Sequence, residues 1–252
     1  MESIYVSVRL IEVETGAIKT TAEDYVTEVS LPKLIKLAEK IGTSLTSDSN
    51  LVNNSGNVNN ASSGGTVERF TVNGVTFEMV KVDGGSFMMG SREGDSDEQP
   101  VHSERVGDFY IGKTEVTQQL WVAIMGNNPS DLRGENLPVE NVSWFDCQEF
   151  VERLSRMTGR IFRLPTETEW EYAARGGNRS RGYKYSGSND LYRVAWYTEN
   201  SESRTHPVGS KLDNELGLYD MSGNVWEWVS DNYSKSYLQS RNGSVRVNRG
   251  GG

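Results

Sequence analysis

The sequence predicts a loop-rich α+β protein in which a small hairpin-plus-helix segment precedes the main domain. Hydrophobic residues make up 35% of the 252 residues, and the 26 glycines outnumber every aromatic residue type, which favours many turns around a modest core. Strand-like alternation and helix-like periodicity occur in separate short segments. Beyond Gly177 little periodicity remains, and a loop-forming stretch of this length usually carries function.

The first 42 residues predict a β-hairpin followed by a helix. Apolar and polar residues alternate over residues 4–11, a turn signal follows at 14–16, and residues 17–25 form the expected return strand. Residues 31–42 have the apolar spacing of one helix face and end at a glycine. The opening sequence also resembles the last strands of an α/β domain in curli-secretion-type bacterial lipoproteins. The segment is therefore either a fragment of another domain or a hairpin and helix that pack on the main domain.

Residues 43–66 consist mostly of Ser, Asn and Gly and contain almost no apolar side chains. Such a stretch cannot bury enough apolar surface to stay ordered, so it predicts a flexible linker. The main domain is expected to occupy residues 67–252. Limited proteolysis is expected to cut within the linker first.

The main domain opens with a strand-forming sequence. Residues 70–77 predict a hairpin whose turn is Asn73-Gly74, and residues 78–82 predict a second strand. Three helices are expected to follow. They span residues 117–125 with Thr114 or Thr117 as the N-cap, 144–158 between Ser143 and Gly159, and 167–174 between Thr166 and Gly176-Gly177.

Most polar and aromatic residues around the third helix are expected to be structural. Pro165 fixes the backbone before this helix, and Thr166 with Glu169 has the spacing of a capping box. Arg163 and Glu167 are interpreted as ion-pairing residues rather than catalytic ones. Four tryptophans are expected to anchor the core. They are Trp144, Trp170, Trp196 and Trp226.

The charge balance limits the classes of partner. The chain has 26 Lys and Arg against 35 Asp and Glu, a formal net charge of −9, which argues against nucleic-acid binding and suits binding of cations through oxygen. No apolar run approaches the ~18 residues that a membrane span requires. The first residues lack the pattern of a signal peptide. We expect a cytoplasmic protein if the chain is complete, and a periplasmic or cell-surface protein if the native N-terminus carries a signal sequence.

Cysteine and histidine are scarce. The single cysteine, Cys147, excludes an internal disulfide and a cysteine-pair metal site. With only two histidines, His102 and His206, a zinc site built from Cys and His is nearly excluded. Cys147 lies in the second expected helix and is interpreted as a small buried apolar residue.

Seven ordered segments carry a specific resemblance. They are FEMVKVDGGSFMMGS (77–91), EGDSDEQPVH (93–102), FYIGKTEVTQQLW (109–121), NLPVENVSWFDCQEF (136–150), RIFRLPTETEWEYAARGG (160–177), AWYTENSESRTHPVG (195–209) and NELGLYDMSGNVWEWVSD (214–231). Together they resemble the sulfatase-modifying-factor, or formylglycine-generating-enzyme, family over residues 70–252. The resemblance implies the C-type lectin-like variant fold of that family, with a small twisted sheet, two principal helices and long ordered loops.

The loop over residues 217–228 is the expected metal site. Calcium takes six to eight oxygen ligands from carboxylates and carbonyls. The resemblance implies a structural calcium ion held by the side chains of Asp220 and Glu227 and the carbonyls of Gly223 and Val225. The alternative is a solvated turn in which the two acidic side chains cap backbone amides. A second calcium site of the family, near residues 194–203, is not assigned because no Asp occupies the expected place.

The resemblance also implies a redox site that this chain lacks. Formylglycine-generating enzymes oxidise a sulfatase cysteine with O₂, using two cysteines that bind copper after an RGGSW-like motif. Here residues 249–252 match the start of that motif and the chain ends, so the domain is expected to be C-terminally truncated, without catalytic residues and without copper. The truncation is also expected to expose a sheet edge and to leave a marginal or association-prone monomer.

Three functions remain open at this stage. The first is a non-catalytic binding or interaction module for an unknown protein or carbohydrate ligand, in one form a ligand-binding protein diversified by a retroelement. The second is a formylglycine-generating oxidase whose catalytic cysteines are missing from this chain. The third is a scaffold beside another enzyme, such as a sulfatase or a kinase.

Overall fold

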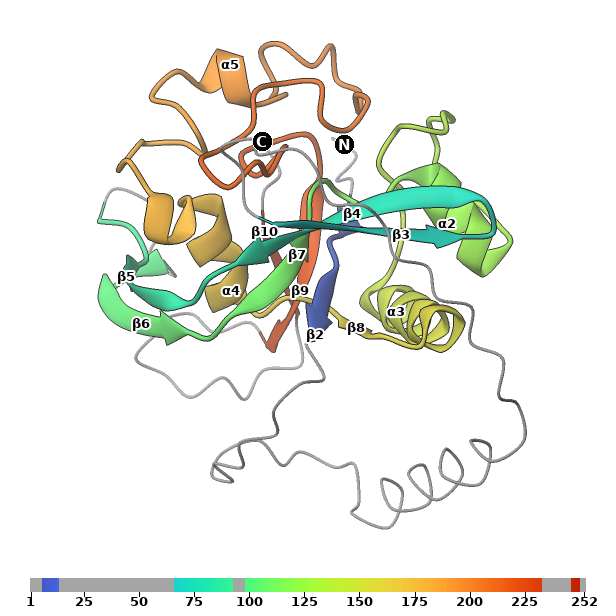
Figure 1. Ribbon diagram of the computed structural model, residues 1–252. Helices are drawn as coiled ribbons and strands as arrows, with labels where there is room; N and C mark the ends of the chain where they lie inside the picture. Colours follow the sequence, from blue (N-terminus) through green and yellow to red (C-terminus); the bar gives the residue numbers. More distant parts are fainter. Residues whose placement is uncertain (1–5, 14–65, 93–97, 233–245, 250–252) are drawn as a thin grey trace, which may run out of the picture. The chain divides into compact units, whose positions relative to one another are not determined.

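The structure is a computed structural model that describes residues 6–13, 66–92, 98–232 and 246–249 (Figure 1). Two compact units divide the chain. Met1–Thr15 and Ser63–Gly252 form one unit, and Gly16–Ser62, the other, lies outside the described residues. The return strand, the helix and nearly all of the linker expected before residue 67 fall in that undescribed stretch. The boundaries at residues 42 and 66 therefore stay predictions.

A five-stranded sheet organises the described unit in the order β3-β4-β7-β2-β8. Every neighbouring pair in it is antiparallel. The strands are β2 (Ile11–Val13), β3 (Val67–Val72), β4 (Val75–Val82), β7 (Phe109–Gly112) and β8 (Ile161–Arg163). The hairpin turn is at Asn73-Gly74, as predicted, and both residues have positive φ (48° and 82°). The two strands expected over 75–82 are one strand, because β4 pairs continuously with β3 and then with β7.

Two smaller sheets complete the fold. In one, β9 (Trp226–Asn232) lies between β1 (Val6–Val8), which is parallel to it, and β10 (Arg246–Arg249), which is antiparallel. The other pairs β5 (Gly85–Met89) with β6 (His102–Val106). The strand expected over residues 4–11 is therefore divided at Arg9 and Leu10. Its halves, β1 and β2, belong to two different sheets.

The three predicted helices are confirmed with their N-caps. α2 (Gln118–Met125), α3 (Trp144–Thr158) and α4 (Glu167–Ala174) start after the side-chain caps Thr117, Ser143 and Thr166. Capping boxes close the starts of α3 and α4. α2 and α3 end at glycines in the left-handed conformation, whereas α4 ends at Arg175, one residue before Gly176. Between α4 and β9 the described chain is loop, except for the single turns η2 (Gly177–Arg179) and α5 (Leu191–Val194), as the lack of periodicity predicted.

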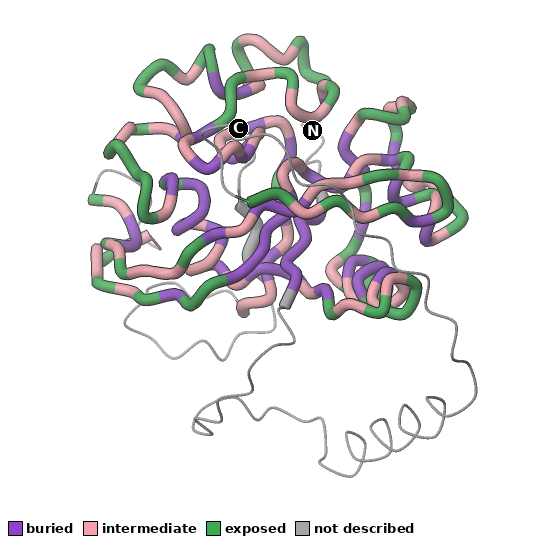
Figure 2. The backbone as a smooth tube through the Cα atoms, in the orientation of Figure 1, coloured by how far each residue is buried: buried purple, intermediate pink, exposed green. Residues whose placement is uncertain are grey.

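The core consists of two hydrophobic clusters on opposite faces of the five-stranded sheet. Met79 and Tyr110 belong to the first cluster with α2 and α3, whereas their strand neighbours Val80 and Ile111 belong to the second with α4. This alternation follows from the two-residue period of side chains along a strand. Figure 2 shows the buried residues along the central strands and on one side of each long helix. Within the described ranges, no helix combines the length and the apolar character that crossing a membrane requires.

The tryptophan prediction is right only in part. Trp170 is buried, and Trp144 packs against the first cluster. Trp196 is only partly buried and belongs to neither cluster, so the expectation for it is wrong. The expectation for Trp226 is wrong, because its side chain is 38% exposed. In β9 the residues that point inward are Glu227 and Val229, so Trp226 faces the other way. The deepest indole is Trp121, which is 2% exposed and was not among the four.

The charges around α4 are structural. Arg163 donates to both carboxylate oxygens of Glu169, at 2.6 and 2.7 Å, which ties β8 to the first turn of α4. Glu167 is buried, and its backbone N–H donates to Asp231 in β9. The interpretation of Arg163 as an ion-pairing residue is confirmed, with Glu169 as its partner.

Candidate functional site

The predicted calcium loop is folded tightly against residues 195–209. Asp220 and Asn224 have positive φ (61° and 69°), which asparagine and aspartate adopt more readily than most residues. A Cβ at Gly223 would lie 2.2 Å from the carbonyl oxygen of Trp196, so only glycine fits there. The next amide, that of Asn224, donates to this same oxygen at 2.8 Å. Glycine is therefore required here for close packing.

The Asn224 side chain joins three segments. Its Oδ1 accepts from the backbone N–H of His206 at 3.0 Å, and its Nδ2 donates to the carbonyl of the same residue at 3.2 Å. Nδ2 also donates to Glu115 Oε2 at 3.3 Å. The loop, the turn at His206 and the chain before α2 are thus fixed to one another.

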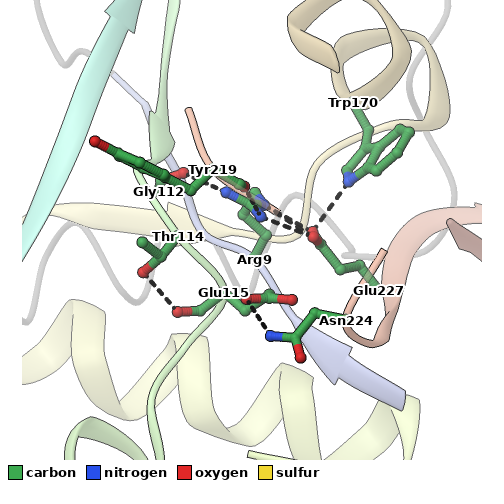
Figure 3. A network of polar contacts seen from close by, with 8 residues as sticks. All are labelled: Arg9, Gly112, Thr114, Glu115, Trp170, Tyr219, Asn224 and Glu227. Atoms are coloured by element: carbon green, nitrogen blue, oxygen red, sulfur yellow. Dashed lines mark hydrogen bonds and ion pairs between the residues drawn. The ribbon is translucent and has the colours of Figure 1, made fainter. Parts of the chain in front are cut away.

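A fully buried ion pair occupies the centre of the site (Figure 3). Arg9 lies between β1 and β2, and Glu227 is the second residue of β9; neither side chain is exposed to solvent. Arg9 Nε donates to Glu227 Oε2 at 2.8 Å, and Nη2 donates to Oε1 at 2.9 Å. The remaining Arg9 donors reach the carbonyls of Gly112 and Tyr219, each at 2.9 Å. Trp170 Nε1 donates to Glu227 Oε2 at 3.0 Å, so both carboxylate oxygens of Glu227 are engaged.

Two further carboxyl groups lie in the same buried region. Asp220 is 2% exposed, and its Oδ2 accepts from the Gly209 amide at 2.7 Å. Glu115 is 1% exposed. Glu115 Oε1 and Asp220 Oδ1 accept no hydrogen bond from a described N–H or hydroxyl donor, and the two carboxyl groups lie within hydrogen-bonding reach of each other when one of them is protonated. If all three carboxyl groups were ionised, the single Arg9 charge would leave a net charge of −2 out of contact with water.

Protonation relieves this excess charge. Burial raises the pKa of Glu115 well above its ordinary value, and the neighbouring charge of Asp220 raises it further. Burial also raises the pKa of Asp220, against the opposing effects of the Gly209 amide and Arg9. Both shifts favour the neutral, protonated form of these carboxyl groups, and the pKa of Glu115 is the one raised well above its ordinary value. With Glu115 protonated, the site holds one guanidinium, two carboxylates and one carboxylic acid.

Several of the predicted calcium ligands have protein partners in this arrangement. Both carboxylate oxygens of Glu227 accept hydrogen bonds, from Arg9 and Trp170, and Asp220 Oδ2 accepts from the Gly209 amide. The Gly223 carbonyl accepts from the Val225 amide within the loop, at 3.1 Å. Across the described residues, no group of three or more His, Cys, Asp or Glu side chains is placed to hold a metal ion. Calcium at this loop stays a prediction.

The other sequence candidates lie in separate elements. Cys147 is fully buried in α3, and burial, reinforced by the charge of Asp146, raises the pKa of its thiol well above the ordinary value. His102 lies in β6 beside Glu104, with 3.2 Å between the ring nitrogen and the carboxylate. The His206 ring stacks on Trp196 with 3.7 Å between ring centroids.

The sequence interpretation missed Arg9, Glu115 and Trp170 as members of the site. Arg9 carried no clear signal, because the alternation over residues 4–11 puts it on the same strand face as Ser7, the face expected to be polar. Nothing local connects it to Glu227, which is 218 residues away.

Comparison with known proteins agrees with this architecture. Residues 64–252 match the family model of the sulfatase-modifying factor enzyme 1-like domain. The chain is 37% identical over 228 residues to the chaperone protein LppX of Paenibacillus barcinonensis, an alignment that covers 71% of this chain and 79% of the relative. It is 29% identical over 248 residues to the formylglycine-generating enzyme of Streptomyces coelicolor, with 68% and 77% covered. It spans only 29% of the length of the chlamydial serine/threonine-protein kinases that it also matches.

A solved structure shares the fold. Treponema denticola variable protein 1 superposes with a TM-score of 0.65 at 33% identity, covering 73% of this chain and 87% of that one. An inactive member is also similar in sequence, since the inactive C-alpha-formylglycine-generating enzyme 2 of Bos taurus is 35% identical over 123 residues, 45% of this chain and 37% of the relative. The chain therefore belongs to the family of sulfatase-modifying factor enzyme 1-like domains, with the formylglycine-generating-enzyme type of C-type lectin-like fold.

Proposed function

We propose that this chain is a non-catalytic binding or interaction module built on the formylglycine-generating-enzyme scaffold. The observation that carries the proposal is the state of Cys147. The thiolate is the form of cysteine that binds copper and reacts, and the Cys147 thiol is fully buried in α3 with its pKa raised by burial. It packs in the first core cluster beside apolar side chains, as a structural cysteine does.

The loops before the calcium-predicted segment offer a surface for a ligand. We call the side chains of Tyr192, Lys211, Trp196 and His206 the aromatic row. The Lys211 ammonium lies 4.4 Å from the Tyr192 ring centroid and 3.9 Å from that of Trp196, and Trp196 stacks on His206. Tyr192 is 62% exposed. Aromatic rings held in place by stacking lose little entropy on binding, which suits contacts with protein or carbohydrate.

A pocket adjoins the row through His206. Its volume is about 360 Å³, and its lining includes the guanidinium-bearing residues Arg133 and Arg204. Arg204 is paired with Glu202 at 2.7 Å, so Arg133 is the arginine of this pocket that favours a ligand with an acidic group, on a chain whose net charge is −9. The similarity to a protein named as variable supports the narrower proposal of a ligand-binding protein of the retroelement-diversified kind.

The catalytic part of the proposal is tested with a sulfatase-motif cysteine peptide. The chain is incubated with the peptide, copper and O₂, and mass spectrometry measures formylglycine. We expect no conversion above a metal-only control. Conversion that disappears in Cys147→Ser would refute the proposal and make Cys147 catalytic. Conversion by a form of the protein that carries the two family cysteines would support the alternative, a formylglycine-generating oxidase, which the similarity to the Streptomyces coelicolor enzyme favours.

The binding part is tested on arrays of acidic glycans and acidic peptides. Tyr192→Ala and Arg133→Ala should each reduce binding at least ~5-fold, the loss expected for about 1 kcal/mol of contact energy. The matched control is Phe145→Ala, because Phe145 is 77% exposed and lies on α3, outside the row and the pocket. Equal loss in all three variants, or binding that none of them changes, would remove this surface from the proposal.

A further inference from the structure

The N-terminal strands complete a core that the rest of the described chain leaves open. β2 lies inside the five-stranded sheet between β7 and β8, and among the described strands β8 pairs with β2 alone. Val8 and Leu10 enter the first hydrophobic cluster, whereas Ile11 enters the second. Residues 6–13 thus fill a slot that spans both clusters. We call them the inserted segment.

Charge complementarity fixes the inserted segment in its slot. Arg9 and Glu12 have fully buried side chains, and they pair with Glu227 and Arg160. The backbone of the segment is held as well, since the Leu10 and Val8 carbonyls accept from the amides of Gly112 and Val116 at 2.8 and 2.9 Å. All of these partners lie far along the chain from the segment. The slot therefore recognises a specific strand, with a basic and an acidic residue three positions apart.

The chain that connects the inserted segment to β3 is far longer than is needed for the segment to reach the slot of its own copy. Ile11, Ile111, Val80 and Val67 are successive partners across the sheet, so β2 and the start of β3 are three strand spacings apart, about 14 Å. Residues 14–66, which connect the two strands, number 53. A chain of that length spans up to ~175 Å when extended. It is long enough to reach the slot of another molecule.

We propose that the slot between β7 and β8 is an interaction site for the inserted segment of a second copy of this chain. Two copies that exchange segments form a closed dimer in which every contact of the single copy is kept, because each slot receives the same residues. Effective concentration decides between the two forms. A segment tethered to its own slot acts at an effective concentration on the order of 1 mM, so the closed single copy dominates well below that concentration.

Complementary charge reversals at the buried pair test the exchange in the full chain. Arg9→Glu puts like charges against Glu227 in one protein, and Glu227→Arg puts like charges against Arg9 in another. Only an exchanged heterodimer satisfies both slots. After the two variants are refolded together, native mass spectrometry is expected to show a one-to-one heterodimer. The matched control is Arg9→Glu refolded with the unsubstituted chain. In this mixture the substituted segment meets Glu227 in either slot, so exchange does not remove the contact between like charges and no heterodimer is expected.

A shortened connection provides a second test that does not depend on the reversed charges. Deleting residues 15–65 leaves Glu14 and Thr66 between β2 and β3, a reach of ~11 Å against the ~14 Å required, so this variant cannot close on itself. We expect it to double in mass to a folded dimer, whereas deletion of residues 31–62 leaves enough chain and should stay a single copy. A folded single copy in the first deletion, or a charge-reversed mixture with no heterodimer above the control, would overturn the proposal.

Discussion

Replacing Arg9 by methionine is expected to be the most destabilising single change in the buried site. Methionine keeps most of the apolar stem of Arg9 but removes its charge and every donor that it supplies. The Glu227 carboxylate is then left without a counter-ion at zero exposure, and it keeps only Trp170 Nε1 as a donor. The carbonyls of Gly112 and Tyr219 also lose their side-chain donor.

The size of the effect follows from these contacts. Removing one partner of a buried ion pair typically costs ~3–5 kcal/mol, and the burial and bidentate geometry of Arg9 and Glu227 place the cost toward the upper end. The measurement is denaturant-induced unfolding followed by tryptophan fluorescence, with the free energy of unfolding taken from the midpoint at an unchanged slope. If Arg9→Met lowered the free energy of unfolding by less than ~0.5 kcal/mol, this would refute both the buried ion pair and the position of the inserted segment in its slot.

A double-mutant cycle separates the pair from the packing around it. Glu227→Leu removes the other charge, and Arg9→Met with Glu227→Leu removes both. Because replacing a whole buried pair by apolar residues is often neutral, we expect the double variant to be more stable than Arg9→Met alone. The cost of the two single changes should therefore exceed that of the double change by at least ~1 kcal/mol. Simple additivity would mean that the two side chains do not interact.

Three further predictions concern the same loop. Burial, and then the charge of Asp220, raise the pKa of Glu115 in the folded chain, so the contribution of Glu115 to stability is complete below its unfolded pKa near 4.5 and is lost as the pH rises through its folded pKa. Glu115→Gln should therefore flatten the fall in unfolding free energy measured from about pH 4 to about pH 8. An unchanged slope would contradict the protonation of Glu115. Gly223→Ala should lower the free energy of unfolding by ~1–3 kcal/mol, because its Cβ would meet the Trp196 carbonyl oxygen at 2.2 Å. Thermal unfolding measures this, with Gly107→Ala as the control at a site where a Cβ meets no atom within 4 Å and φ is not positive, and equal losses would remove the role of close packing. Calcium should bind the unsubstituted chain at the loop over residues 217–228, and Asp220→Ala should weaken this binding; isothermal titration measures this, and no binding, or binding that Asp220→Ala leaves unchanged, would contradict the predicted site.

The predictions that succeeded depend on short stretches of sequence. Thr117, Ser143 and Thr166 were identified as caps because a side-chain oxygen and an amide three residues later make the cap by themselves. The Asn73-Gly74 turn succeeded for the same reason, since both residues tolerate positive φ. Of the predicted site residues, Asp220 and Gly223 are buried in the loop before β9, and Glu227 is buried in β9 and paired with Arg9, whereas their role as calcium ligands stays a prediction.

The sequence by itself determined the family, the helix ends and the hairpin of this protein, because motif order, caps and turn residues act over a few positions. Only the tertiary structure decided where the strand around Arg9 goes. Alternation shows that a strand forms there, but its sheet partners lie on β7, β8 and β9, about 100 to 220 residues further along the chain. The tertiary structure likewise decided that Glu227 faces the core and Trp226 faces away from it. Both faces of β9 carry an apolar side chain, so the sequence alone does not show which face is buried. A buried arginine in reach of Glu227 made the inward face the stable one, and that arginine comes from the opposite end of the sequence.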